Sequence, residues 1–274
     1  MNEHNNSVVR VEFDEHVAVL TLDRPEKMNA MGQAIWDALP AAIEQIDDND
    51  DIRAVALVAN GPAFSVGLDF IDMMPQLGLN SPGPDGHRQR TLHRLIRKMQ
   101  AAVTAVERCR VPVVAAVHGY CLGAGVDLIT ACDIRVASQD AIFGVREPRV
   151  AIVADLGTLQ RLPRLIGVGQ ARELIYSGRD FDSDEALQLG LVNRVSADAE
   201  QARASAISLA REIAQNAPLA VQGSKRVMLE AHRGDIDREL EYVATWNAAH
   251  LLSQDLGRAV EAFITKSKPR FEGR

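Results

Sequence analysis

The apolar pattern changes along the chain, and this change constrains the fold more than any other feature. Up to about residue 155, short β-branched segments alternate with stretches of helical periodicity. From Thr158 onward, helical patterns follow one another with little strand between them. Alternating strands and helices are typical of layered architectures with right-handed crossovers. We therefore expect an α/β protein with a C-terminal helical region.

The individual elements are predicted as follows. Segments 8–13 and 17–22 predict a β-hairpin, because three polar residues separate two β-rich runs. Pro40 is expected to kink or interrupt the helix in which it falls. The other expected strands are 55–58, 113–117 and 134–137, and the expected helices are 33–46, 91–109, 126–132, 158–166, 169–176, 184–189, 198–215, 217–231, 236–252 and 256–264. A glycine and proline cluster at 76–87 predicts a mobile loop, with a lid as one role.

Composition excludes several function classes. The 274 residues carry a net charge of −7, whereas a general nucleic-acid binder usually presents a basic face. No apolar run approaches the ~20 residues that a membrane-spanning helix needs. We recognise no secretory signal or transit peptide at the start and no peroxisomal address at the end. These observations predict a cytoplasmic protein that binds neither nucleic acid nor membrane.

Cysteine and histidine patterns give no sign of a disulfide framework or a metal. Cys109, Cys121 and Cys132 are scattered without a C-x-x-C spacing, and the seven histidines are dispersed. Cys121 and Cys132 fall in apolar segments, so we expect them to be inert buried thiols. No metal is expected.

Three carboxylates are candidates for chemistry. Asp127, Glu147 and Asp155 each lie among apolar or small residues, where a charge is costly unless it is used or paired. Each also has a structural interpretation: a helix-start carboxylate for Asp127, a surface residue for Glu147 and a helix N-cap for Asp155. Asp133 is expected to be structural and to pair with Arg135.

Two glycine turns accompany these acids. One is Phe64–Asp69, which follows a predicted strand, and the other is Leu122–Gly125, which precedes a predicted helix. Either can be an ordinary turn, but glycine also allows a backbone N–H to face a cleft and polarise a carbonyl oxygen. Two such amides beside carboxylates are what an enzyme needs to make and quench an enolate.

At these residues the chain resembles the crotonase (enoyl-CoA hydratase/isomerase) superfamily. The supporting motifs are Arg-Pro-Glu-Lys-Met-Asn-Ala at 24–30, Ala-Phe-Ser-Val-Gly-Leu-Asp at 63–69 and Pro-Val-Val-Ala-Ala-Val at 112–117. Segments 125–135 and 154–163 are similar to those of the Δ3,5-Δ2,4-dienoyl-CoA isomerases within that superfamily.

The resemblance covers roughly residues 8–271 and implies a fold and an assembly. The fold would be a spiral of repeated ββα units. Residues 1–197 would form the crotonase-like core, and residues 198–274 would form a C-terminal helical trimerisation region. A homotrimer, or a hexamer made of two trimers, is the implied assembly.

The resemblance also implies roles for individual residues. Asp127, Glu147 and Asp155 match the three acidic positions of the isomerases. The amides of Leu68 and Ala124 would form an oxyanion hole for the thioester oxygen, although many relatives have glycine at the position of Ala124. Further expected contacts with coenzyme A are Met28, the carbonyl of Val66, and Phe263 and Lys266 in the tail.

Together these residues predict an acyl-CoA isomerase that shifts 3,5-dienoyl-CoA to 2,4-dienoyl-CoA through a dienolate. Asp155 would be the base at C2, Glu147 the acid at C6, and Asp127 would tune or bridge the pair. Coenzyme A belongs to the substrate, so no separate cofactor is expected. The alternatives are an enoyl-CoA hydratase, which in this family uses two glutamates, and a non-catalytic acyl-CoA-binding or RNA-binding protein.

Overall fold

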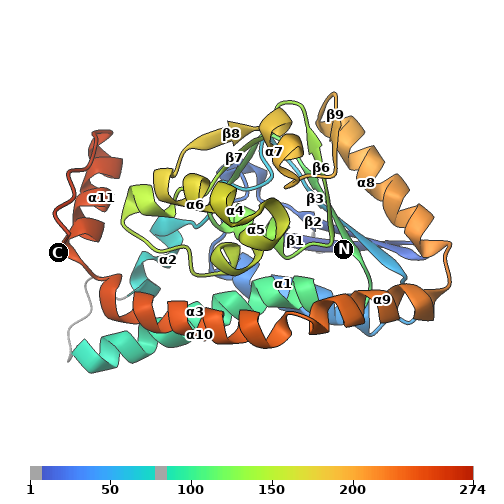
Figure 1. The fold of residues 1–274 in the computed structure, drawn as a ribbon, viewed down its shortest axis with the longest axis horizontal. Coiled ribbons are helices and arrows are strands. Elements are labelled where there is room, and N and C mark those ends of the chain that lie inside the picture. Colours follow the sequence, from blue (N-terminus) through green and yellow to red (C-terminus); the bar gives the residue numbers. More distant parts are fainter. Residues whose placement is uncertain (1–7, 78–84, 274) are drawn as a thin grey trace, which may run out of the picture.

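The computed structural model describes residues 8–77 and 85–273 (Figure 1). Residues 78–84 of the mobile loop expected at 76–87 lie outside the described residues, and its ends, 76–77 and 85–87, are helical rather than loop. The strands are β1 (Val9–Asp14), β2 (Val17–Leu22), β3 (Ala54–Ala59), β4 (Val113–Val117), β5 (Tyr120–Leu122), β6 (Ile134–Ser138), β7 (Ile142–Gly144), β8 (Asp180–Asp182) and β9 (Arg194–Ser196). The α-helices are α1 (Gln33–Asp47), α2 (Phe70–Leu77), α3 (Asp85–Arg108), α4 (Ala124–Thr130), α5 (Thr158–Ile166), α6 (Val168–Ser177), α7 (Ser183–Leu189), α8 (Ala199–Ala214), α9 (Pro218–Glu230), α10 (Arg233–His250) and α11 (Gln254–Thr265), with 3-10 helices η1 (Pro25–Lys27) and η2 (Glu147–Val150).

The main sheet has the strand order β1-β2-β3-β4-β6-β9. The predicted hairpin is confirmed, since β1 pairs antiparallel with β2 from Val9↔Leu22 to Asp14↔Val17. The remaining strands run parallel to β2. Strands β5, β7 and β8 form a second, three-stranded sheet. The prediction of an α/β fold is confirmed.

Strand β3 shows how the main sheet is buried on both faces. Its side chains alternate between faces, as the period of two in a strand requires. Val55 and Leu57 enter the large core under α1, α3 and α4, whereas Ala54, Ala56 and Val58 pack with α8. A strand covered on both faces reads as a continuous apolar run, which is why it was recognisable in the sequence.

Helix α8 covers the second face of the sheet, as Figure 1 shows at the right. Its contact side is made mostly of alanines, which allow the helix backbone to approach the strands closely. The buried residues on this side are Ala202, Ala206, Leu209, Ala210 and Ala214. Helix α8, the first part of the expected 198–274 region, is thus packed on the sheet; the trimerisation role of that region remains a prediction.

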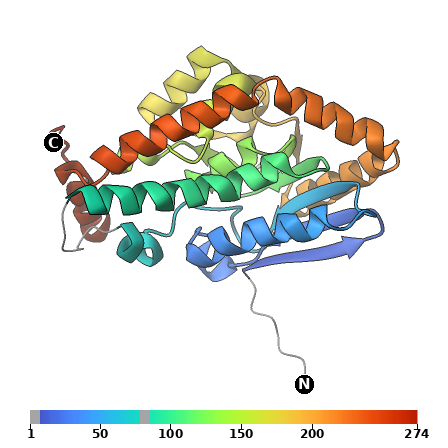
Figure 2. The same cartoon turned by 90° about the horizontal axis from the view of Figure 1, so that it is seen from below.

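Helices α3 and α10 lie side by side and antiparallel along the other side of the molecule (Figure 2). Arg108 at the end of α3 pairs with Asp237 near the start of α10 at 2.6 Å, and His93 near the start of α3 contacts Glu241 at 3.0 Å. The pair brings the C-terminal part of the chain next to the core. This placement matters for the site described below.

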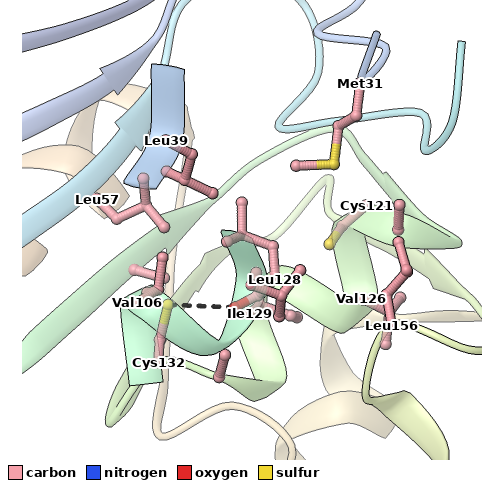
Figure 3. Close-up of a cluster of buried hydrophobic side chains, with 14 of the residues drawn as sticks. Met31, Leu39, Leu57, Val106, Cys121, Val126, Leu128, Ile129, Cys132 and Leu156 are labelled. Carbon is pink, nitrogen blue, oxygen red and sulfur yellow. Dashed lines mark hydrogen bonds between the residues drawn. The ribbon is translucent and has the colours of Figure 1, made fainter. Parts of the chain in front are cut away.

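Short helix α4 is anchored by apolar side chains (Figure 3). Val126, Leu128 and Ile129 are fully buried in the core that also contains Met31 and Leu57. The Cys132 thiol lies 3.5 Å from the carbonyl oxygen of Leu128. Anchoring residues on both sides of Asp127 fix the direction in which that carboxylate leaves the helix.

Three expectations about local structure were wrong. Helix α1 runs unbroken through Pro40, because its buried face packs against the sheet and outweighs one missing hydrogen bond. Asp133 does not pair with Arg135: its carboxylate lies 2.7 Å from Lys225 Nζ, and the Arg135 guanidinium donates to the carbonyls of Ile129, Leu191 and Cys132. The three-residue strands β5, β7, β8 and β9, and helix α2, were not predicted.

The cysteines behave as expected. Cys109, Cys121 and Cys132 are free and buried. Burial raises the pKa of the Cys132 thiol to about 12, and it also raises the pKa of Cys121. The thiols are therefore protonated and unreactive at neutral pH.

Candidate active site

The two glycine turns lie side by side, one after β3 and the other at the end of β5, where an isolated parallel bridge joins Ser65 to Cys121. The turn after β3 pairs with β5: Ser65 N donates to Tyr120 O at 3.0 Å, and Leu122 N donates to Ser65 O at 3.0 Å. In open α/β sheets, ligands bind beyond the carboxyl ends of the strands. The sequence motifs thus meet at a place suited to binding.

Gly67 allows the close approach of the turns. Its φ is +91°, and a Cβ atom there would lie 2.9 Å from the carbonyl oxygen of Leu122 and 3.5 Å from Ala124 N. A side chain would force the two turns apart. The expected oxyanion donors, Leu68 and Ala124, follow these close contacts directly.

The amides of Leu68 and Ala124 are free to bind a ligand. Within residues 8–77 and 85–273, neither N–H donates a hydrogen bond to the protein. The loop before Leu68 is nevertheless fixed on both sides, because Met31 N donates to Gly67 O at 2.7 Å and Asp69 N donates to Met31 O at 3.1 Å. Ala124 is the first residue of α4, so its amide also lies at a helix N-terminus.

Asp127 is one turn further along α4 and is 1% exposed. Its Oδ1 accepts the backbone N–H of Thr158, the first residue of α5, at 2.6 Å. The expected N-cap role of Asp155 was therefore wrong, since the N-terminus of α5 is bound by Asp127 from another helix. Asp127 therefore lies in the first turn of α4 and also binds the N-terminus of α5.

Asp155 lies in the segment that leads into α5. Its Oδ2 accepts the side-chain amide of Asn247 on α10 at 2.7 Å. Its backbone carbonyl accepts the side-chain amide of Gln100 on α3 at 2.6 Å. Both partners come from the antiparallel helix pair, so α3 and α10 position this acid.

Glu147 opens the 3-10 helix η2 and turns its carboxyl group toward the start of α4. A Cβ atom on Gly123 would lie 3.5 Å from Glu147 Oε1, which places the acid beside the Ala124 amide. The other oxygen, Oε2, is buried and has no hydrogen-bond partner among the described residues. A buried oxygen without a partner favours the protonated acid.

Burial raises the pKa of all three acids. Loss of water raises the pKa of Asp127 to about 6, opposed by its hydrogen bonds from Thr158. Burial raises the pKa of Asp155 to about 7, opposed by the Asn247 hydrogen bond and reinforced by the negative charge of Asp127. The pKa of Glu147 lies well above its usual range, first through burial and then through Asp127 and Asp155. Each acid affects another, so the structure brings the three predicted carboxylates together.

The expected coenzyme A contacts fall into two groups. Met28 and Val66 are adjacent, since Val66 N donates to Met28 O at 3.2 Å, and the Met28 side chain is exposed. Phe263 and Lys266 lie exposed on and just after α11, which packs against η2. Among the described residues, no hydrogen bond or ion pair joins the two groups within one chain.

Sequence reasoning missed Asn247 and Gln100, which are both 2% exposed. A signal was present in each case. Asn247 interrupts the apolar face of α10 formed by Ile236, Leu240, Val243, Ala244 and Ala248. A polar residue on a buried helix face requires hydrogen-bond partners, and here those partners belong to the site.

Comparisons with known proteins agree with this geometry. The model of the family described as enoyl-CoA hydratase/isomerase matches residues 12–274. The peroxisomal Delta(3,5)-Delta(2,4)-dienoyl-CoA isomerase of Arabidopsis thaliana is 43% identical, covering 96% of this chain and 95% of that protein. The mitochondrial Delta(3,5)-Delta(2,4)-dienoyl-CoA isomerase of Mus musculus is 41% identical, over 97% of this chain and 82% of that protein.

Hydratases and solved structures are more distant relatives. The short-chain-enoyl-CoA hydratase of Clostridium acetobutylicum is 33% identical, over 97% of each chain. A crystal structure of an enoyl-CoA hydratase/isomerase from Pseudoalteromonas atlantica superposes with a TM-score of 0.85 at 29% identity, covering 97% of this chain and all of the other.

Proposed function

The chain belongs to the enoyl-CoA hydratase/isomerase family, and on that premise we propose that it converts 3,5-dienoyl-CoA to 2,4-dienoyl-CoA. The observation that carries the proposal is the convergence of three buried carboxylates beside two unpaired backbone amides. The 41–43% identity to dienoyl-CoA isomerases over nearly the whole chain supports the same reaction.

The reaction shifts two double bonds along the acyl chain, with a proton lost at C2 and a proton gained at C6. Asp155 takes a proton from C2, and the electrons of that C–H bond form a dienolate. Glu147 then donates a proton to C6 as the double bonds settle at C2 and C4. The substrate and product have the same composition, so the proton on Asp155 must return to Glu147 or exchange with solvent. Asp127 raises the pKa of both, and we propose that it tunes or bridges the pair.

The dienolate carries most of its charge on the thioester oxygen. The amides of Leu68 and Ala124 are proposed to donate to that oxygen, each worth about 3 kcal/mol in the transition state. Because both N–H groups are held by turns that touch at Gly67, they need little rearrangement when charge develops. Met28 and Val66 would lie beside the adenine of coenzyme A, and Phe263 and Lys266 would contact its nucleotide, in the same or a neighbouring subunit.

Asp127 gives a physical reason to favour isomerisation over hydration. Hydration requires two carboxylates that hold one water molecule between them. Here one oxygen of Asp127 is already committed to the Thr158 amide at 2.6 Å. The shorter side chain and this bond leave Asp127 poorly placed to share a water with Glu147.

The proposal includes the setting of the enzyme. We propose that coenzyme A enters as part of the substrate, without a separate cofactor, and that three chains, or six, assemble. Light scattering after size-exclusion chromatography measures the assembly.

No helix within residues 8–77 and 85–273 is long and apolar enough to cross a membrane. The cytoplasmic location stays a prediction, since the relatives named above are called peroxisomal and mitochondrial.

The test is a paired ultraviolet assay of purified protein. With a 3,5-dienoyl-CoA, the conjugated 2,4-dienoyl absorbance is expected to rise, and with crotonyl-CoA the enoyl absorbance is expected to persist. Loss of crotonyl absorbance without dienoyl conversion would instead make the protein a hydratase. A second test is Gly67→Ala, which is expected to force the two turns apart and to lower turnover about 100-fold.

A further inference from the structure

Asn247 is buried on α10 and uses both hydrogens of its side-chain amide. Nδ2 donates to Asp155 Oδ2 at 2.7 Å and to the carbonyl oxygen of Val153 at 2.8 Å. The residue is 2% exposed, so the amide has little freedom to rotate away. Because Val153 and Asp155 belong to one segment, the two bonds fix the Asp155 carboxylate relative to the backbone of that segment.

Gln100 provides a matched arrangement on α3. Its Nε2 donates to Asp155 O at 2.6 Å and to Leu240 O at 3.0 Å, while its Oε1 accepts from Arg97 at 2.8 Å. Gln100 thus holds the main chain of Asp155, whereas Asn247 holds the carboxylate. Both residues are 2% exposed and each amide donates two hydrogen bonds, but the amides differ in which part of Asp155 they bind.

Glu147 has no such donor at Oε2. A hydrogen bond to one oxygen of a carboxylate favours the ionised form and leaves the other oxygen as the place where a proton is received. An acid without a donor, in the same buried and negatively charged surroundings, favours the protonated form. The two acids therefore differ in one hydrogen-bond donor: the Asn247 amide binds Asp155 Oδ2, whereas no donor among the described residues binds Glu147 Oε2.

We propose that Asn247 is a positioning residue that assigns the roles of the two acids. By holding Asp155 Oδ2, it presents Oδ1 as the base for the C2 proton and leaves Glu147 to carry the proton that is returned. The inference deepens the proposed isomerase reaction and rests on it for the identity of the substrate. The C-terminal helix α10 would then be part of the catalytic apparatus rather than only of the assembly.

Several charged groups surround Asp155 and set the background for its titration. Asp127 on α4 raises the pKa of Asp155 by repulsion, and Asp127 and Asp155 both raise the pKa of Glu147 on η2. The nearby cations are committed elsewhere: Arg161 on α5 pairs with Glu107 at 2.8 Å, and Arg97 on α3 pairs with Glu241 on α10 at 3.3 Å. Asn247 is therefore the neutral donor that opposes these effects.

The experiment is a carbon-13 NMR titration of protein labelled at the aspartate carboxyl carbon. Loss of a signal in Asp155→Asn assigns Asp155. In Asn247→Leu, which keeps the branched heavy-atom skeleton but removes the donor, the pKa of Asp155 is expected to rise by about one pH unit. In Gln100→Leu, which loses two donated hydrogen bonds as well as the bond accepted from Arg97, the Asp155 titration is expected to stay in place. The acid limb of the pH–turnover profile should move upward with Asn247→Leu alone.

The outcomes separate the two proposals. An unchanged Asp155 titration in folded Asn247→Leu, or an equal change in Gln100→Leu, would overturn the role of Asn247. If Asn247→Leu does not fold, Asn247→Ser replaces it. A smaller rise in the pKa of Asp155 is then expected, and an unchanged pKa would overturn the inference. The titration uses no substrate, so absent turnover of 3,5-dienoyl-CoA would reject the proposed function without touching the hold of Asn247 on Asp155.

Discussion

Two groups of buried or half-buried carboxylates in this protein have opposite surroundings. Glu107 and Asp133 each have a cation within hydrogen-bond distance: Arg161 at 2.8 Å and Lys225 at 2.7 Å. Within the described ranges, no lysine, arginine or histidine nitrogen lies within 4.0 Å of the carboxylate oxygens of the second group, Asp127, Glu147 and Asp155. One group joins helices and strands, and the other gathers beside free amides.

The difference shows how burial serves structure in one place and chemistry in the other. A buried carboxylate with a cation stays ionised and resists removal, because its loss strands a buried positive charge. A buried carboxylate without a cation has a raised pKa and exchanges protons near neutral pH. The comparison therefore predicts opposite responses when each group is neutralised.

The largest expected effect is on turnover in the cation-free group. Asp155→Asn removes the base and is expected to lower turnover of 3,5-dienoyl-CoA by about 10³- to 10⁴-fold. Glu147→Gln should lower turnover by a similar factor, because the amide cannot donate the proton that C6 receives. The measurement is the dienoyl absorbance assay, with far-ultraviolet circular dichroism to establish that the variants fold. Near-normal turnover in either folded variant would contradict its role.

The next effect is on stability in the cation-paired group. Glu107→Ala leaves Arg161, which is 3% exposed, without its partner, and is expected to cost about 3–5 kcal/mol of unfolding free energy. Urea denaturation measures the loss. The control is Asp235→Ala, which breaks the exposed pair with Arg238 and is expected to cost at most about 0.5 kcal/mol. Equal losses in the two variants would remove the distinction between buried and exposed pairs.

Stability should respond in the opposite direction in the cation-free group. The pKa of Asp155 is about 7 in the folded chain and near 3.8 when unfolded, so its contribution to stability is fully present below about pH 4 and is lost as pH rises through about 7. Asp155→Asn is therefore expected to gain about 2–4 kcal/mol of unfolding free energy at pH 8 and almost none at pH 4. Urea denaturation of both proteins at the two pH values tests this. A loss at pH 8 would be the contrary result.

The smallest expected effect is that of Asp127→Asn. The amide oxygen can still accept the Thr158 N–H, so the N-terminus of α5 should remain bound. Removing the negative charge should lower the pKa of Asp155 and Glu147, so the whole pH–turnover profile moves downward by about one pH unit. Turnover at the optimum should fall about tenfold or less. A profile that stays in place would show that Asp127 does not tune the other acids.

Local pattern was sufficient for much of the fold. Strand β4 and helix α5 begin and end at the predicted residues, because a continuous β-branched run and a helical periodicity each report burial directly. Strands β5, β7 and β8 are only three residues long, too short for a period to be recognised. They hold the turns of the site together, so the part of the fold closest to the chemistry was the least visible in the sequence.

The sequence by itself determined the layered α/β class, the three acids, the two glycine turns and, through them, the family. These features depend on residue type and on neighbours along the chain. Only the tertiary structure decided that Asp127 binds the start of α5, that Asp133 pairs with Lys225, and that Asn247 and Gln100 hold Asp155. Those bonds join residues 31 to 92 positions apart, in some cases across separate helices, and no local periodicity encodes such partners. Which carboxylate is paired with a cation, and which is left to exchange a proton, is fixed by packing.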